Sequence, residues 1–293
     1  MTQKGAQAPF RINFIALGSA HNVDIQARVN SCDAPYARKR TQQRLAVVGL
    51  GESSLYAINE LREWDGDIWA INGAAAWLAD KGIVSTMVTV DPLPFPDFAF
   101  HGISSALFAS CADPSAFEQM RDRVEKFDMI EHSDTGVIGG CTTATRMPAL
   151  AVSLGYTDVT FFGCEGSFTK RNHVDSERTY PEQLIINADG VDYVSVPEFV
   201  LQAQSLASVM REWPDIFKEK SGGLLRGMIL DQNWSVVAVS SALKGQIEEI
   251  SGSHGLYEMS YQFNKEHGGA RTTPSAVTGV TLAATYGLCL TSI

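Results

Sequence analysis

The stretch from residue 44 to residue 72 constrains the fold of this chain most, because it predicts a strand, a glycine turn, a helix and a second strand in direct succession. Residues 45–48 form a short apolar run without helical periodicity, which is typical of a buried strand. Gly49-Leu50-Gly51 then allows a tight turn and a close approach of a ligand to the backbone. Because the following helix begins with free backbone N–H groups, this turn is a candidate site for an anion.

The helix after this turn is predicted from its cap and its periodicity. Ser53 or Ser54 can cap its first turn. The apolar positions that recur at helical spacing, and that are expected to face the core, are Leu55, Ile58 and Leu61.

The second strand of the unit, Asp67–Ile71, ends at Asn72, and this residue bears on the ligand. The dinucleotide fingerprint has a third glycine where Ser54 stands, and an acid about twenty residues further on. A carboxylate at the end of the second strand would hold a ribose diol, so the amide of Asn72 disfavours NAD. An amide can instead donate and accept hydrogen bonds toward a base or a sugar. A glycine turn that binds nothing is the alternative.

Composition excludes several classes of protein. The net charge of −10 over 293 residues argues against a broad nucleic-acid surface. The five cysteines are an odd number without a C-x-x-C pair, and no signal peptide is evident, so we expect free thiols in a reducing cytoplasm. Residues 275–293 carry no charge, but Ser, Thr and Gly interrupt them, so we interpret them as a buried helix and strand in preference to a membrane contact.

Apolar strand patterns alternate with helical patterns along most of the chain. This alternation predicts a Rossmann-like α/β fold with a mostly parallel central sheet and helices on both faces. We divide the chain into an N-terminal arm over residues 1–43, a nucleotide-binding core over residues 44–230, and a C-terminal extension over residues 231–293 that packs on the core. The sequence leaves open whether the protein is a homo-oligomer.

Within the core, the third strand is predicted over residues 84–90 and runs directly into Asp91. An acid at the carboxyl end of a buried strand lies where open α/β sheets bind ligands. Residues 114–126 are predicted to form an amphipathic helix. Residues 185–193 predict a hairpin with Asp189-Gly190 at its turn, and Gly227 is interpreted as part of a loop.

A second glycine turn carries unusual chemistry. Thr142 or Thr143 opens a helix after a glycine-rich segment, and the next strand, residues 159–162, ends at Gly163. The turn that follows contains Glu165. Two cations and a histidine come shortly after it, at Lys170, Arg171 and His173. We interpret the nearby Cys141 and Cys164 as small buried residues, since no histidine partner for a nucleophile is evident.

Several short motifs resemble one family of transferases. They are, in chain order, VVGLGESS, IWAIN, TVDP, the helix end SLGY, the turn FFGCEGSF with His173 after it, and SGGLLRG. Together they resemble the 6-hydroxymethylpterin diphosphokinase MptE-like family, which includes a domain of flagellin-modifying glycosyltransferases. The same skeleton is similar to the small bacterial CMP-sialic-acid sialyltransferases. The resemblance covers residues 44–227.

This resemblance implies roles for individual residues around a nucleotide. Gly49, Gly51 and Ser53 would cradle its phosphates. Asn72 would contact the base or sugar, and Thr143 would lie at the nucleotide at a helix start.

The resemblance also implies a catalytic set. His173 would be the catalytic base, and Asp91 and Glu165 could hold Mg²⁺ with substrate phosphates completing its shell. Lys170 and Arg171 could neutralise a diphosphate. The plainer alternatives are that Asp91 caps a turn, that the two cations are solvated, and that the histidine is an exposed loop residue.

Two departures from the family pattern favour a protein without catalysis. Glu52 stands where the family has a proline, and it adds a negative charge beside the phosphate turn. Glu165 replaces the usual aspartate, which moves the carboxylate outward by one methylene group.

The function expected from this resemblance is transfer of diphosphate from ATP to a hydroxymethyl, pterin-like acceptor. One alternative is a glycosyltransferase that uses a CMP-linked acidic sugar, and another is a non-catalytic nucleotide-binding subunit. An NAD(P)-dependent enzyme is a weaker option, because the acid after the second strand is absent.

Overall fold

The computed structural model describes residues 10–15, 27–92, 94–129, 134, 136–139, 142–168, 183–240, 247–249 and 257–262. Its centre is a seven-stranded sheet in the order β10-β7-β2-β3-β4-β5-β6, in which every neighbouring pair is parallel. The strands are β2 Arg44–Val48, β3 Asp67–Ile71, β4 Thr86–Thr89, β5 Ser105–Ala109, β6 Val124–Phe127, β7 Asp158–Phe162 and β10 Phe217–Glu219. The predicted Rossmann-like α/β fold is therefore confirmed.

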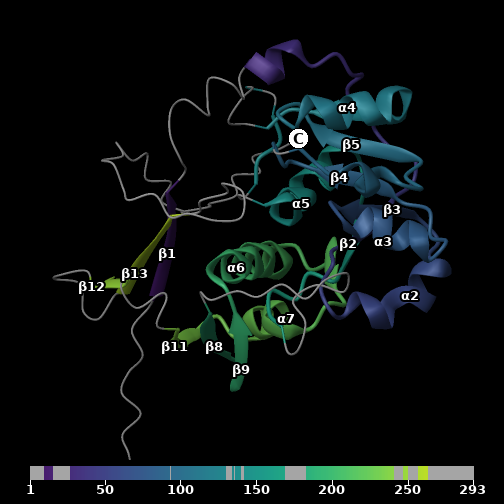
Figure 1. Cartoon of the computed structure of the whole chain (residues 1–293). Helices are drawn as coiled ribbons and strands as arrows, with labels where there is room; N and C mark the ends of the chain where they lie inside the picture. Colours follow the sequence, from purple (N-terminus) through teal and green to yellow (C-terminus); the bar gives the residue numbers. More distant parts are fainter. Residues whose placement is uncertain are drawn as a thin grey trace, which may run out of the picture.

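Helices cover both faces of this sheet (Figure 1). One face packs against α2 Ser54–Arg62, α3 Ala74–Asp80, η1 Asp97–Phe100 and α4 Pro114–Met120, which continues into η2 Arg121–Arg123. The other face packs against α5 Thr143–Ser153, α6 Pro197–Glu212 and α7 Gly223–Leu230. Among the described helices, none combines the length and the apolar character that crossing a membrane requires.

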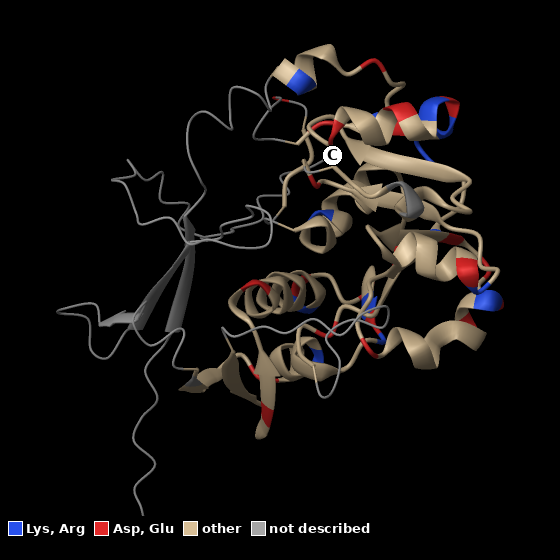
Figure 2. Cartoon of the chain, in the orientation of Figure 1, with Lys and Arg blue, Asp and Glu red and all other residues tan. Residues whose placement is uncertain are grey.

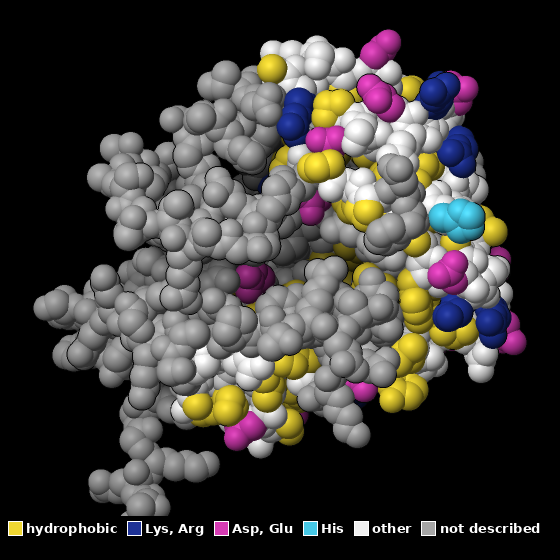
Figure 3. All heavy atoms as spheres, in the orientation of Figure 1, with side chains coloured by type: hydrophobic (Ala, Val, Ile, Leu, Met, Phe, Trp, Pro, Cys, Tyr) yellow, Lys and Arg dark blue, Asp and Glu magenta, His cyan; other side chains and the backbone are white. Residues whose placement is uncertain are grey.

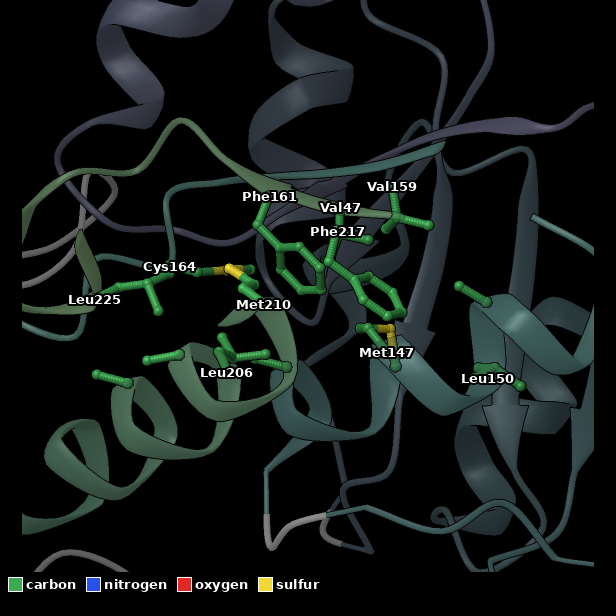
Figure 4. Packing of buried hydrophobic residues seen from close by; sticks show 14 of the residues in the cluster. Val47, Met147, Leu150, Val159, Phe161, Cys164, Leu206, Met210, Phe217 and Leu225 are labelled. Carbon is green, nitrogen blue, oxygen red and sulfur yellow. The ribbon is translucent and has the colours of Figure 1, made fainter. Parts of the chain in front are cut away.

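The alternation of side chains along the central strands explains the two cores. Leu45 and Val47 of β2 point into the cluster under α5, α6 and α7, whereas Ala46 and Val48 point into the cluster under α2, α3 and α4. Figure 4 shows the first cluster, in which Phe161 of β7 lies beside other apolar side chains of the sheet and of α5 and α6. A strand buried on both faces must be apolar throughout, as this one is.

A small antiparallel sheet, β11-β8-β9, extends the core beyond α7. It consists of β8 Leu184–Ala188, β9 Val191–Ser195 and β11 Ser235–Val239. The predicted hairpin is confirmed, because Asp189 and Gly190 join β8 to β9 with φ angles of 52° and 73°. Hydrophobic side chains reach the surface in this part of the molecule, as Figure 3 shows in yellow near the bottom of the view.

A strand from the N-terminal part of the chain pairs with a strand from its C-terminal part. The third sheet has the order β1-β13-β12, and it consists of β1 Phe10–Ile15, β12 Ile247–Glu249 and β13 Tyr257–Gln262. The backbone of β1 pairs in parallel with that of β13, and β12 pairs antiparallel with β13. The segment predicted to be buried at residues 275–293 lies outside the described residues.

Charged residues are interspersed along the outer helices. Figure 2 shows acidic and basic positions mixed on the helices, whereas most of the central sheet carries neither. Among the described residues, no helix gathers a run of cations of the kind that binds a nucleic-acid backbone.

The predictions of the buried face of α2 and of the length of α4 are wrong. Leu55 is 43% exposed, and the buried positions of α2 are Ser54, Ala57 and Leu61. The predicted helix over residues 114–126 ends at Met120, because residues 124–127 join the sheet beside β5.

Gly227, predicted to lie in a loop, is instead inside α7. A Cβ atom at Gly227 would stand 2.9 Å from the ring of Tyr193. Glycine therefore lets α7 pack closely on β9, and packing overrides the low helix propensity of this residue.

The position of the core predicts a large difference between two leucine truncations. Leu45→Ala, at a fully buried position of β2, is expected to lower the free energy of unfolding by about 2–5 kcal/mol, because it leaves a cavity in the central sheet. Leu230→Ala, at a position that is 62% exposed, is expected to change it by less than about 0.5 kcal/mol. Urea unfolding of the two variants measures both values, and equal losses would contradict the described core.

Candidate functional site

The order of the strands reverses beside β2. The chain leaves β2 toward β3, β4, β5 and β6, and it then returns to place β7 on the other side of β2. Open α/β sheets bind ligands at such a reversal, at the carboxyl ends of the strands. Two turns lie there, residues 49–53 after β2 and residues 163–167 after β7. They are the two glycine turns on which the sequence-based prediction depends.

The two turns contact each other directly. The backbone N–H of Gly51 donates to the carbonyl of Gly163 at 2.9 Å, and the N–H of Gly163 donates to Oγ of Ser53 at 3.2 Å. A Cβ atom on Gly49 would overlap the carbonyl oxygen of Gly163, and one on Gly163 would overlap that of Gly49. Gly163 also has a φ of 65°, which favours glycine. Close packing of the two turns therefore accounts for both glycines.

The side chain of Glu165 occupies the space beside Gly51 and Ser53 in the turn after β2. Its Oε1 accepts a hydrogen bond from the backbone N–H of Ser53 at 2.9 Å, and its Oε2 accepts one from the hydroxyl of Ser53 at 3.0 Å. Only 6% of the surface of Glu165 is exposed. A Cβ atom on Gly51 would overlap this carboxyl group, so the glycine makes room for it. An internal carboxylate thus lies at the N-terminus of α2, where the helix dipole favours an anion.

Burial raises the pKa of the Glu165 carboxyl group above the ordinary glutamate value, hydrogen bonds from Ser53 lower it, and the charge of Glu52 raises it. An acid whose pKa is higher in the folded than in the unfolded chain favours folding most when it is protonated. Its contribution therefore falls as the pH rises from below the ordinary glutamate pKa through the raised one.

Neither serine of the turn caps α2 with its side chain, contrary to the prediction. Ser53 is the N-cap residue, but its hydroxyl donates to Glu165. The hydroxyl of Ser54 donates to the carbonyl of Gly49 at 2.8 Å. Both hydroxyls thus hold the two turns in place.

A second group of polar residues lies at the ends of β3 and β4. Asn72 follows β3 in a left-handed conformation with a φ of 50°, and its backbone N–H donates to Val88. The hydroxyl of Thr143, the first residue of α5, lies 3.5 Å from Oδ1 of Asn72 and accepts a hydrogen bond from the N–H of Val90 at 3.3 Å. Asn72, Thr143 and the segment leading into Asp91 therefore lie close together.

Asp91 and Glu165 do not come together. Asp91 follows β4 and Glu165 follows β7, and β2 and β3 lie between these strands. Three strand spacings correspond to about 14 Å. Both oxygens of Glu165 already accept hydrogen bonds from Ser53. The described residues contain no group of three or more His, Cys, Asp or Glu side chains suited to a metal ion. The placement of the two acids thus argues against a Mg²⁺ ion held by both.

Three predicted site residues, Lys170, Arg171 and His173, lie outside the described residues, as does Cys141. Cys164 is buried, and burial raises the pKa of its thiol far above the ordinary value. Figure 4 shows its side chain within the apolar cluster, so it is a small core residue and not a nucleophile.

Two residues near this edge were missed from the sequence. Nη1 of Arg28 donates to the carbonyl of Pro92 at 2.6 Å, so the N-terminal arm brings a cation to the loop after β4. The hydroxyl of Thr142, which caps α5, donates to Gln202 of α6 at 3.2 Å. Neither residue belongs to a motif, and only the tertiary fold brings them to the edge of the sheet.

These features define a Rossmann-like α/β protein with two polar groups at the carboxyl edge of its sheet. One is the Ser53–Glu165 pair, and the other is formed by Asn72 and Thr143. No protein-family model, curated protein or solved structure matches the chain.

The contact between Gly51 and Glu165 predicts that substitutions at these two positions are not additive. Gly51→Ala is expected to destabilise the protein by about 1–3 kcal/mol, because the new methyl group collides with the carboxylate. In the Glu165→Ala background the same change should cost at least about 1 kcal/mol less. Chemical denaturation of the wild type, both single variants and the double variant measures this coupling.

Gly66→Ala is the control for this cycle, since a Cβ there would crowd the carbonyl of Arg44, away from the turn. Its cost should be the same with and without Glu165. Additive costs for Gly51→Ala and Glu165→Ala would contradict the described contact.

Proposed function

We propose that this protein is a nucleotide-dependent transferase, and that its nucleotide binds over the carboxyl ends of β3 and β4. The observation that carries this proposal concerns Asn72. Its backbone is in the left-handed conformation, and its side chain lies beside Thr143. Among residues other than glycine, asparagine and aspartate adopt this conformation most often, as Asp189 does in the hairpin turn, and it is also found at functional sites. Within the described part of the chain, Nδ2 of Asn72 makes no hydrogen bond.

The chemistry of an amide suits a base or a sugar. Nδ2 of Asn72 can donate to a ring nitrogen or carbonyl, and Oδ1 can accept from an amino or hydroxyl group. Thr143 is the first residue of an eleven-residue helix, whose N-terminal partial positive charge favours a phosphate. Its own hydroxyl is buried, donates to Asn72 and accepts from Val90, so it positions the amide. Asn72 and the start of α5 together can thus bind both parts of a nucleotide.

The reaction that fits the family resemblance is transfer of diphosphate from ATP to a hydroxymethyl group on a pterin-like acceptor. The acceptor oxygen forms a bond to the β-phosphorus, the bond from that phosphorus to the α-phosphate oxygen breaks, and AMP leaves. His173 accepts the proton of the acceptor hydroxyl. Lys170 and Arg171 neutralise the transferred charge. Asp91 would be the protein ligand of a Mg²⁺ ion that binds together with the phosphates and would offset their negative charge. The alternative donor is a CMP-linked acidic sugar.

The position of Glu165 favours a second candidate, a nucleotide-binding subunit without catalysis. Its carboxylate is buried and both of its oxygens accept from Ser53, so it is engaged in holding the two turns together. A residue bound in this way is poorly placed for a metal ion or for acid–base chemistry.

Removal of the Asn72 amide tests the proposed nucleotide site. Asn72→Gly keeps a residue that adopts a positive φ, so the fold should be preserved while the affinity for the nucleotide falls by about tenfold. Thermal shift and calorimetry with ATP, CTP, CMP and CMP-sugars, with and without Mg²⁺, give the readout. Asn59→Ala, at an exposed position of α2, is the control. Absence of a shift for the wild type with every nucleotide would refute the proposal.

Substitution of His173 separates the two candidates. For a transferase, His173→Ala should lower turnover by about 10²–10⁴-fold and leave nucleotide affinity unchanged, because the base acts on the acceptor. For a binding subunit, the wild type should show no turnover and the variant no change. His101→Ala, at an exposed position, is the matched control.

A further inference from the structure

The anion position of the first glycine turn is filled by the protein itself. A phosphate at such a turn is bound by backbone N–H groups at the start of the helix. Here the N–H and the hydroxyl of Ser53 both donate to the carboxylate of Glu165, at 2.9 and 3.0 Å. The absent Cβ of Gly51 leaves the space that this carboxylate occupies. The features that suggest a phosphate site in the sequence are therefore used by an internal acid.

We propose that Glu165 is a specificity-determining residue that closes the turn after β2 to phosphate. A second anion at Ser53 would find its donors engaged and would meet a negative charge within a few ångströms, in a site with little water to screen it. The consequence for the ligand depends on the proposed function. A nucleotide that contacts Asn72 and Thr143 has to place its phosphates away from Ser53.

The backbone around Glu165 is held firmly, so the carboxylate does not swing away with a loop. The carbonyl of Glu165 accepts a hydrogen bond from the N–H of Leu225 at 2.8 Å, which ties it to α7. The N–H of Cys164 donates to the hydroxyl of Ser221 at 3.0 Å. A Cβ atom on Gly223 would lie 2.6 Å from Cβ of Glu165, so α7 also packs against the side chain. The position of the Glu165 side chain in the turn after β2 is therefore fixed by the packing of α7.

Removal of the carboxylate should open the turn. The probe is inorganic pyrophosphate, titrated into the full-length wild type and into Glu165→Ala by calorimetry. We expect the affinity of the variant to rise by at least about tenfold, because the N–H and hydroxyl of Ser53 become available to the anion. Adding Ser53→Ala to Glu165→Ala should remove part of this gain, which locates the anion at the turn.

Asp113→Ala is a closely matched control. Asp113 is also a buried acid, at 9% exposure, and its Oδ1 accepts from both the N–H and the hydroxyl of a serine, Ser115, at 3.0 and 2.5 Å. This substitution removes the same charge at the start of α4, where the sheet order does not reverse. Because Oδ2 of Asp113 lies 3.9 Å from Nη1 of Arg28, the control is measured with Arg28→Ala present in both this variant and its reference. Its affinity for pyrophosphate should equal that of this reference.

Each possible result either supports the proposal or overturns it. A gain in Glu165→Ala that is absent in Asp113→Ala supports the proposal. Equal affinities of the wild type and a folded Glu165→Ala overturn it, and so does an equal gain in both variants, which would reflect the net charge alone. If Glu165→Ala does not fold, Glu165→Ser decides, since its short polar side chain removes the charge and leaves the N–H and hydroxyl of Ser53 available to the anion. A gain in that variant supports the proposal, and no gain overturns it.

The experiment stands apart from the proposed function because its probe is not a nucleotide. A gain for pyrophosphate in Glu165→Ala, together with no nucleotide binding by the wild type, would leave this inference intact and remove the nucleotide site at Asn72. Nucleotide binding that depends on Asn72, without a gain in Glu165→Ala, would give the opposite result.

Discussion

The contact between the turns after β2 and β7 is the constraint on which the rest of the structure depends. The carbonyl of Gly163 accepts from Gly51, and the carboxylate of Glu165 accepts from Ser53, so the turn after β7 is joined to the turn after β2, the first strand of this sheet along the chain. This contact needs residues without side chains on both sides. The glycines here allow the two turns to pack against each other. In a phosphate-binding turn, glycines instead allow a ligand to approach the backbone.

The carboxyl edge of the sheet therefore has two parts with different character. Beside β2 and β7 it is closed, and an acid satisfies the donors at the start of α2. Beside β3 and β4 it presents the partly exposed amide of Asn72, which the buried hydroxyl of Thr143 contacts. A ligand that lies across this edge meets hydrogen-bonding groups on one side and a filled turn on the other. The division, more than any single residue, limits the orientations that a phosphorylated molecule can take.

Much of this architecture was predictable, because strands buried on both faces leave a clear apolar run that ends in glycine. The runs before Gly49 and Gly163 and the hairpin at Asp189-Gly190 are local signals of this kind. The Ser53–Glu165 pair is not local, since 112 positions separate its members. Leu55 was misplaced for a related reason: a serine with a hydrogen-bonded hydroxyl is buried in its stead, and a count of apolar residues cannot detect this.

The pairing of β1 with β13 has a consequence for dissecting the protein. Within the described residues, β1 has no neighbour in its sheet other than β13, which comes from the opposite end of the chain. Removal of β1 alone, or of β13 alone, would leave the backbone N–H and C=O groups of the remaining strand unpaired along one edge. An unpaired strand edge promotes self-association. A shortened version for crystallisation is better cut at both ends together.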